Sequence, residues 1–105
     1  MADGLVGADN REVTALPDDA VRERLARVPD WERADDAIVR TYELASFRAV
    51  IEFVVRIADA AEAANHHPDL DIRYRRLRVA LSTHSEGGIT DQDFALAAQI
   101  DAAAP

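Results

Sequence analysis

Apolar residues recur along the chain with two different spacings, which predict both helices and strands. The strongest helical pattern follows Ser46, a good N-cap residue, and its apolar positions at spacings of three and four form one stripe: Phe47, Val50, Ile51, Val54, Ile57, Ala58 and Ala61. This helix should end near Ala64, because Pro68 disfavours helical geometry at the residue before it. A shorter helix is predicted from Pro17 to Val28, where Pro29 stops the pattern.

Two other segments alternate with the period of a strand. From Trp31 onward we expect a hairpin, with strands at about 30 to 34 and 37 to 44 and a turn between them at Asp35 and Asp36. In its second strand the apolar residues share one side, with Arg40 as the polar exception: Ile38, Tyr42 and Leu44. A later strand has one buried face, formed by Leu77, Val79 and Leu81, and an arginine-bearing face with Arg76 and Arg78.

The C-terminal part predicts a turn followed by a helix. After Gly87 and Gly88, Thr90 and Asp93 fit a capping box, and Ile89 with Phe94 fits a hydrophobic staple, so a last helix should run to about Ala103. The order is helix, two strands, helix, one or two strands, helix, and we expect two strands at the second position. The predicted fold class is therefore α+β, a two-layer domain in which an antiparallel four-stranded sheet carries helices on one face.

Length and composition restrict the classes of function. The 105 residues suit one domain, expected over 15–105 after a loose N-terminal segment over 1–14. Without cysteine or lysine there is no disulfide, thiolate zinc site, cysteine nucleophile or Schiff-base lysine. A net charge of -8 disfavours direct nucleic-acid binding. With no membrane span and no signal sequence in view, we expect a cytoplasmic protein.

All three histidines lie between the end of the long helix and the turn after the last strand: His66, His67 and His84. Glu62 precedes His66 by four residues, so its carboxylate can reach that imidazole if the helix continues that far. Histidine is the side chain whose unperturbed pKa lies near neutrality, so this cluster can both donate and accept protons. The sequence therefore indicates an acid–base site in this region.

These residues are similar to the signature of the pterin-4a-carbinolamine dehydratase family. The motif consists of Glu62, Asn65, His66, His67, Pro68, Tyr74, His84 and Asp93. Outside the motif, the similarity covers the chain beyond Pro17 and includes Trp31, the segment 38–42, Thr83 and the segment 87–90. Many members have an aromatic residue two positions after the proline, where this chain has Leu70.

The resemblance implies a hydro-lyase that dehydrates 4a-hydroxytetrahydropterin to quinonoid dihydropterin and so recycles the pterin of aromatic amino acid hydroxylases. It implies catalytic roles for Glu62 and the three histidines: His66 and His84 are the acid–base candidates, with the division of the two roles left open, Glu62 would orient or polarise His66, and His67 would also help to hold the pterin. The implied substrate-binding residues are Asp93, Tyr74, Asn65, Pro68 and Thr83. No cofactor is implied, since the pterin is the substrate.

The same residues also allow other interpretations. Asp93 has a structural explanation as a capping-box residue, and Tyr74 has one as a sheet-packing residue. A zinc site from the histidines and Glu62 is disfavoured, because adjacent His66 and His67 should point in different directions. The rival function is a noncatalytic relative that serves as a dimeric scaffold or assembly factor. We also expect a homodimer or homotetramer, because a sheet this small leaves edges to protect.

Overall fold

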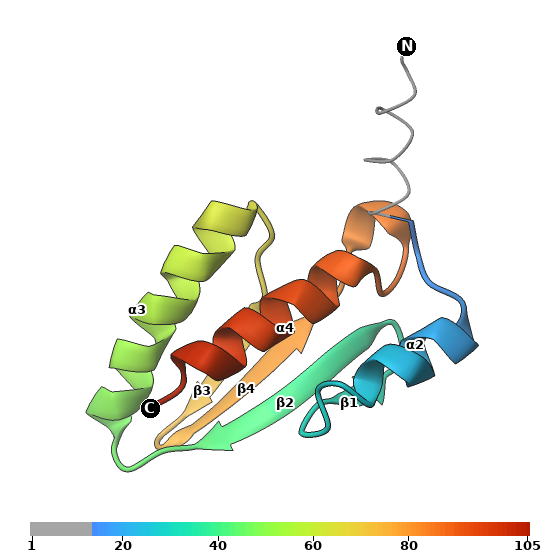
Figure 1. Cartoon of the computed structure of the whole chain (residues 1–105). Coiled ribbons are helices and arrows are strands. Elements are labelled where there is room, and N and C mark those ends of the chain that lie inside the picture. The colour runs from blue at the N-terminus through green and yellow to red at the C-terminus, as the bar shows by residue number, and fades with distance from the viewer. Residues whose placement is uncertain (1–13) are drawn as a thin grey trace.

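A computed structural model describes residues 14–105, and Figure 1 shows the arrangement of its elements. In chain order these are α2 (Asp18–Leu25), β1 (Glu32–Ala34), β2 (Ala37–Glu43), α3 (Phe47–Ala64), β3 (Asp69–Arg73), β4 (Arg76–Leu81), the 3-10 turn η1 (His84–Glu86) and α4 (Asp91–Ala103). The predicted α+β order is confirmed. Apart from Thr14, the predicted loose segment over 1–14 lies outside the described residues.

The four strands form one antiparallel sheet in the order β1-β2-β4-β3. Strands β2 and β4 lie in the middle, and their register places Ile38 opposite Leu81 and Tyr42 opposite Leu77. Because side chains alternate between the two faces of a strand, these four residues share one face of the sheet. This is the face that the alternating pattern predicted to be buried.

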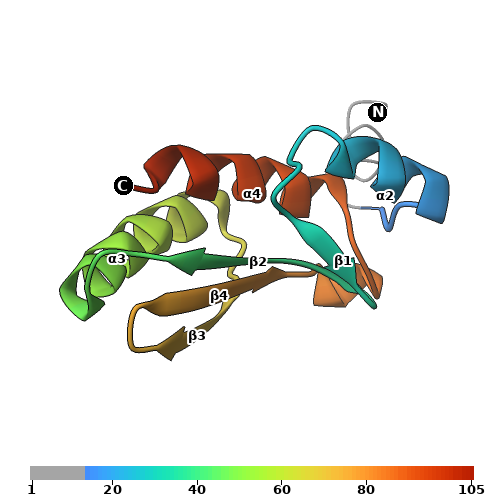
Figure 2. The same cartoon turned by 90° about the horizontal axis from the view of Figure 1, so that it is seen from below.

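The helices cover that face of the sheet and leave the other open, as Figure 2 shows. The core lies between the two layers, and its largest fully buried side chains include Phe53, Ile38, Ile57, Leu77, Leu81, Leu96 and Ile100. The stripe on α3 is thus only partly core: Val50 and Ile57 are buried, whereas Phe47 and Ile51 remain exposed. The apolar stripe is wider than the part of the α3 surface that faces the core, so its margin stays exposed.

The first helix ends earlier than its apolar spacing predicted. It stops at Leu25, and the next backbone N–H groups, of Arg27 and Val28, donate to carbonyls three residues back. These tighter turns carry Val28 into the core outside the helix, with 8% of its surface exposed. The spacing of apolar residues is nearly the same in a last α-helical turn and in such a 3-10-like turn, so it could not tell them apart.

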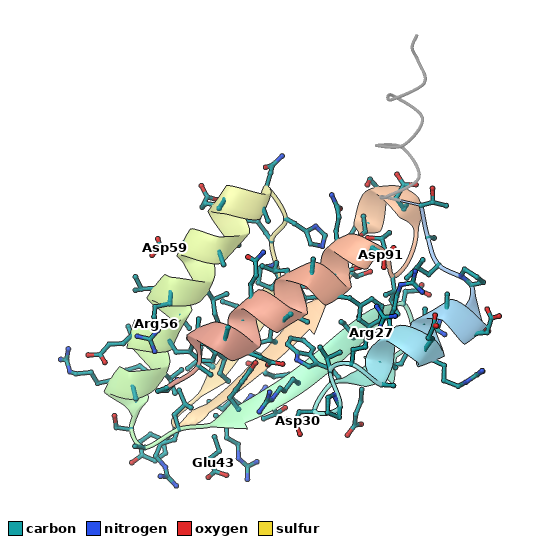
Figure 3. All side chains as sticks on the ribbon, viewed as in Figure 1. Arg27, Asp30, Glu43, Arg56, Asp59 and Asp91 are labelled. Carbon is teal, nitrogen blue, oxygen red and sulfur yellow. The ribbon has the colours of Figure 1, made fainter. Side chains whose placement is uncertain are left out.

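Helices α3 and α4 pack side by side on the sheet. Near their contact, Arg56 of α3 donates through Nε to the carbonyl of Ala103 at 2.9 Å (Figure 3). An arginine at this point satisfies one of the terminal carbonyls that a helix leaves without partners. Among the residues described, no helix is long and apolar enough to cross a membrane.

Candidate functional site

The site begins where α3 ends. Asn65 has left-handed backbone angles, with φ 51° and ψ 44°, and its N–H donates to the carbonyl of Glu62 at 3.2 Å. The N–H of His66 donates to the carbonyl of Ala61 at 3.1 Å, which completes a Schellman motif. The chain therefore turns out of the helix at Asn65, and both histidines lie beyond the helical surface.

Glu62 contacts His67, and the expected pairing with His66 is wrong. The carboxylate Oε2 of Glu62 lies 2.6 Å from Nε2 of His67, and both side chains are largely exposed. The spacing of four brings two residues together only while the helix continues, and here the helix has ended before His66. The chain reverses its direction at Asn65. His67 is one residue further along than His66, and its imidazole is therefore the one that reaches Glu62.

His66 instead pairs with Asp93, the third residue of α4. Its Nε2 lies 2.6 Å from Oδ1 of Asp93, a short hydrogen-bond distance. The His66 side chain is 11% exposed and the Asp93 side chain is fully buried. The sequence placed both residues in the site but did not predict this pairing.

Asp93 has two more hydrogen bonds, both at Oδ2. The backbone N–H of Thr90 donates to it at 2.9 Å, which confirms the predicted capping box, and the hydroxyl of Thr83 donates to it at 2.9 Å. Thr83 is 5% exposed and also bonds the hydroxyl of Thr90 at 2.7 Å. In this arrangement the side chains of Asp93 and Thr83, expected to bind substrate, contact other protein groups behind His66.

His84 immediately follows Thr83 and opens η1. The loop that carries it is closed by a bridge between Thr83 and Gly88, with the N–H of Thr83 donating to the carbonyl of Gly88 at 2.9 Å. The His84 side chain is exposed and has no hydrogen-bond partner among residues 14–105. Thr83 therefore connects the His84 loop to the carboxylate that holds His66.

An open pocket of about 310 Å³ lies beside His84. His84 lines it together with Asp69, the first residue of β3, whereas His66 and His67 are not among the residues that line it. The β1–β2 turn contributes two more carboxylates, those of Asp35 and Asp36. Sequence reasoning assigned Asp35 and Asp36 to a turn and missed them here, because only the sheet topology brings that turn next to the end of β4.

The structure does not bring Tyr74 to the histidines. This residue lies in the turn between β3 and β4, with φ 54° and 72% of its surface exposed. Strand β3 begins beside the histidines at Asp69 and runs away from them, so Tyr74 lies at the far end of the hairpin. Leu70 is nearer, as the second residue of β3, and is 37% exposed.

The remaining predicted residues shape the backbone. Asn65 turns the chain, and Pro68 separates His67 from β3 while remaining partly buried. Within the described part of the chain, no group of three or more histidine or carboxylate side chains is arranged to hold a metal ion. The arrangement supplies two carboxylate-bound imidazoles, those of His66 and His67, and the imidazole of His84, which has no hydrogen-bond partner among the described residues; this set is suited to proton transfer.

Comparisons with known proteins point to one family. A family model described as "Pterin 4 alpha carbinolamine dehydratase" matches residues 14–103. A Chloroflexus aurantiacus protein named "Putative pterin-4-alpha-carbinolamine dehydratase" is 56% identical over 86 residues, which cover 82% of this chain and 92% of that protein. A Nocardia farcinica protein of the same name is 51% identical over 86 residues, covering 82% and 90%.

Two solved structures are similar in fold. The transcriptional coactivator/pterin dehydratase of Brucella melitensis has a TM-score of 0.84 and 32% identity, with 88% of this chain and 100% of that chain covered. A pterin dehydratase-like protein described as a RuBisCO assembly factor in the alpha-carboxysome has a TM-score of 0.58 and 19% identity, with coverage of 70% and 86%. At that identity the second likeness concerns the fold alone. From the family match and the close relatives, the chain belongs to the pterin 4 alpha carbinolamine dehydratase family.

Proposed function

We propose that this protein is a hydro-lyase that removes water from a 4a-hydroxytetrahydropterin and yields the quinonoid dihydropterin. The reaction would return the pterin used by aromatic amino acid hydroxylases to its cycle. The observation that carries the proposal is the pairing of the nearly buried His66 with the fully buried Asp93 at 2.6 Å, on the chain segment that also presents His67. Family membership supports the choice of substrate class.

The reaction needs one proton donor and one proton acceptor. The C4a–O bond breaks and the oxygen leaves as water after it takes a proton. The adjacent ring nitrogen loses its proton, and the electron pair of that N–H bond forms the new C=N bond. Protons and electrons balance without an oxidant or reductant, so two imidazoles in opposite protonation states are sufficient.

We assign the proton acceptor to His66 and the donor to His84. A carboxylate behind His66 stabilises the imidazolium that forms when it accepts a proton, as in other histidine–carboxylate pairs. His84 is exposed in the pocket, so it can regain a proton from water between turnovers. His67 is held at Nε2 by Glu62 and would contact the pterin from the outer side of the site.

The first test is the dehydration rate of a synthetic 4a-hydroxytetrahydropterin with the purified protein. General acid–base catalysis typically contributes about 100-fold to 10,000-fold, so we expect a rate clearly above that in buffer. The rate should be the same after treatment with a chelator, because the proposed chemistry uses no metal. A rate equal to that in buffer would contradict the proposal.

Substitutions at both histidines test the assigned roles. His66→Gln keeps an amide donor for Asp93, and His84→Ala changes an exposed side chain, so both variants should fold. We expect each to lower kcat by about 100-fold, and the double variant to lose less than the product of the two factors. Near wild-type rates in both single variants would show that these histidines do not transfer the protons.

The alternative is a noncatalytic scaffold or assembly factor with the same fold. It is the function described for the alpha-carboxysome protein, which shares this fold at 19% identity. That alternative would be favoured by a protein that folds and assembles, has His66 bound to Asp93, and yet gives no dehydration above buffer.

A further inference from the structure

The hydroxyl groups of Thr83 and Thr90 lie behind His66 in a chain of hydrogen bonds. The donor and the acceptor of each bond in this chain can be assigned in turn. Thr83 donates its single proton to Oδ2 of Asp93 at 2.9 Å. At its 2.7 Å contact with the hydroxyl of Thr90 it must therefore accept, and Thr90 donates. The Thr90 oxygen in turn accepts from the N–H of Gln92 at 3.2 Å. Every proton in the chain points toward Asp93.

This ordering makes Oδ2 of Asp93 an acceptor of two hydrogen bonds. Its Oδ2 already accepts from the hydroxyl of Thr83 and the N–H of Thr90, and its Oδ1 faces Nε2 of His66 at 2.6 Å. Two donors at one oxygen suit the carboxylate form of Asp93, which has no proton to donate, so we assign the proton in the last bond to His66. The exposed fractions are 5% for Thr83 and 0% for Thr90 and Asp93, so water does not compete for these groups.

We propose that Thr83 and Thr90 are positioning residues that hold His66 in the tautomer with its proton on Nε2. The unprotonated nitrogen is then Nδ1, which becomes the atom that accepts the substrate proton. This assignment rests on the proposed role of His66 in dehydration. Thr83 also immediately precedes His84, so the same hydroxyl fixes the proton acceptor and the loop that carries the proton donor.

The tautomer can be measured in the resting protein, without substrate. Nitrogen-15 NMR of the imidazoles at about pH 9, where histidine is neutral, distinguishes a protonated Nε2 from a protonated Nδ1. The signal of His66 is assigned by its loss in His66→Gln. We expect the Nε2–H form in the wild type, and a protonated Nδ1 there would overturn the proposal.

Two substitutions at Thr83 test its contribution. Thr83→Val keeps the shape and removes the hydroxyl, so the His66 signal should shift toward a mixture of tautomers and kcat should fall about tenfold, with KM little changed. Thr83→Ser restores the hydroxyl and should restore both. Thr41→Val is the matched control: it removes an exposed threonine hydroxyl from the open face of the sheet and should leave both unchanged.

The outcomes separate this inference from the proposed function. A fixed Nε2–H tautomer that loosens in Thr83→Val supports the inference even if the protein lacks dehydratase activity. If Thr83→Val leaves the tautomer unchanged in a folded protein, the inference is wrong, whatever the rate. Thermal melts of each variant show whether it folds. If Thr83→Val does not fold, the tautomer of His66 in the wild-type protein still decides whether the inference holds.

Discussion

Asn65 determines the direction in which the two adjacent histidines leave α3. Its left-handed backbone allows the Schellman hydrogen bonds that end the helix, and the next residue, His66, turns toward Asp93. An L-residue with a Cβ and no local hydrogen-bonding ability loses about 1–2 kcal/mol in this conformation, whereas asparagine and glycine tolerate it. The asparagine before the histidine pair thus has a backbone role that is independent of any contact with the pterin.

Asn65→Ala should lower the free energy of unfolding by about 1 kcal/mol, whereas Asn65→Gly should change it by less than about 0.5 kcal/mol. Urea denaturation measures both. The matched control is Ala63→Gly, two residues earlier inside the helix, where glycine should destabilise instead. If glycine were destabilising at both positions and alanine neutral at Asn65, the left-handed assignment would be incorrect.

At the scale of residues, the sequence indicated which side chains gather in this region but not which of them pair. The histidines, Glu62 and Asp93 were all placed in one region, and Asp93 does close the capping box. The pairing of Glu62 was wrong because a rule for helices was applied across a helix end. The pairing of His66 with Asp93 spans 27 residues, and no local pattern encodes a contact of that separation.

At the scale of elements, α4 is held at both of its ends, by the segment between α3 and β3 at its first turn and by the sheet at its last turn. Asp93 in its first turn holds His66, and Asp101 in its last turn accepts hydrogen bonds from Trp31, Arg40 and Tyr42. The Arg40 bond measures 2.7 Å, and its guanidinium also lies 4.3 Å from the centre of the Tyr42 ring. This explains the polar exception in the alternating pattern of β2: Arg40 faces the helices because a carboxylate on α4 is there to bind it.

Burial raises the pKa of the Tyr42 hydroxyl, and the hydrogen bond to Asp101 raises it further. The neutral phenol is therefore favoured in the folded state relative to the unfolded state. Its contribution to stability is complete below the ordinary tyrosine pKa of about 10 and declines as the pH rises above that value. The sign is the same as for any group whose folded pKa is raised.

We expect the free energy of unfolding to fall between about pH 9 and pH 11 in the wild type, and to fall less in Tyr42→Phe. At neutral pH the same substitution should cost about 1.5 kcal/mol, because it removes a donor from Asp101. Urea denaturation across this pH range is the measurement, with Tyr74→Phe, at an exposed turn, as the control. An identical slope in wild type and Tyr42→Phe would rule out this role for Tyr42.

The predictability of each element depended on how completely it is buried. The α3 stripe and the alternation of β4 were clear because each buries several apolar residues at a regular spacing, even though part of the α3 stripe stays exposed. Strand β3 was not located by residue number, since its sequence Asp-Leu-Asp-Ile-Arg offers only two apolar positions and every residue in it is exposed. An edge strand has one hydrogen-bonded neighbour and little core to face, so its pattern is short.

At the scale of the whole molecule, the sheet has two edges that differ in length. Strand β1 has three residues, whereas β3 has five, and each pairs with one neighbour. Figures 1 and 2 show α3 on the β3 side of the sheet. That side is also apolar, with exposed Leu70 and Ile72 on the strand and exposed Phe47, Ile51 and Val55 on the helix. A free edge with apolar neighbours favours pairing with another strand.

The sequence of β3 suits pairing with a second copy of itself. In an antiparallel pair related by a two-fold axis, side chains keep to their faces only if residues of the same parity are opposite one another. An axis at Asp71 would oppose two aspartates. An axis at Ile72 places Ile72 against Ile72 and gives two opposite-charge pairs, each between Asp71 of one copy and Arg73 of the other, which is the more favourable register.

We therefore propose a dimer with an eight-stranded sheet that is continuous across β3. Light scattering at micromolar concentration should give twice the 11.5 kDa chain mass, or four times that mass if dimers pair.

A cysteine substitution tests the register. Because the chain has no cysteine, Ile72→Cys places one thiol at the axis and should form a disulfide-linked dimer on mild oxidation. Thr41→Cys, on the inner strand β2, should remain unlinked. A monomer in solution would refute the dimer. A dimer that Ile72→Cys fails to cross-link would refute this register, because directly opposed residues of an antiparallel pair lie about 4.5–5.5 Å apart, close enough for a disulfide.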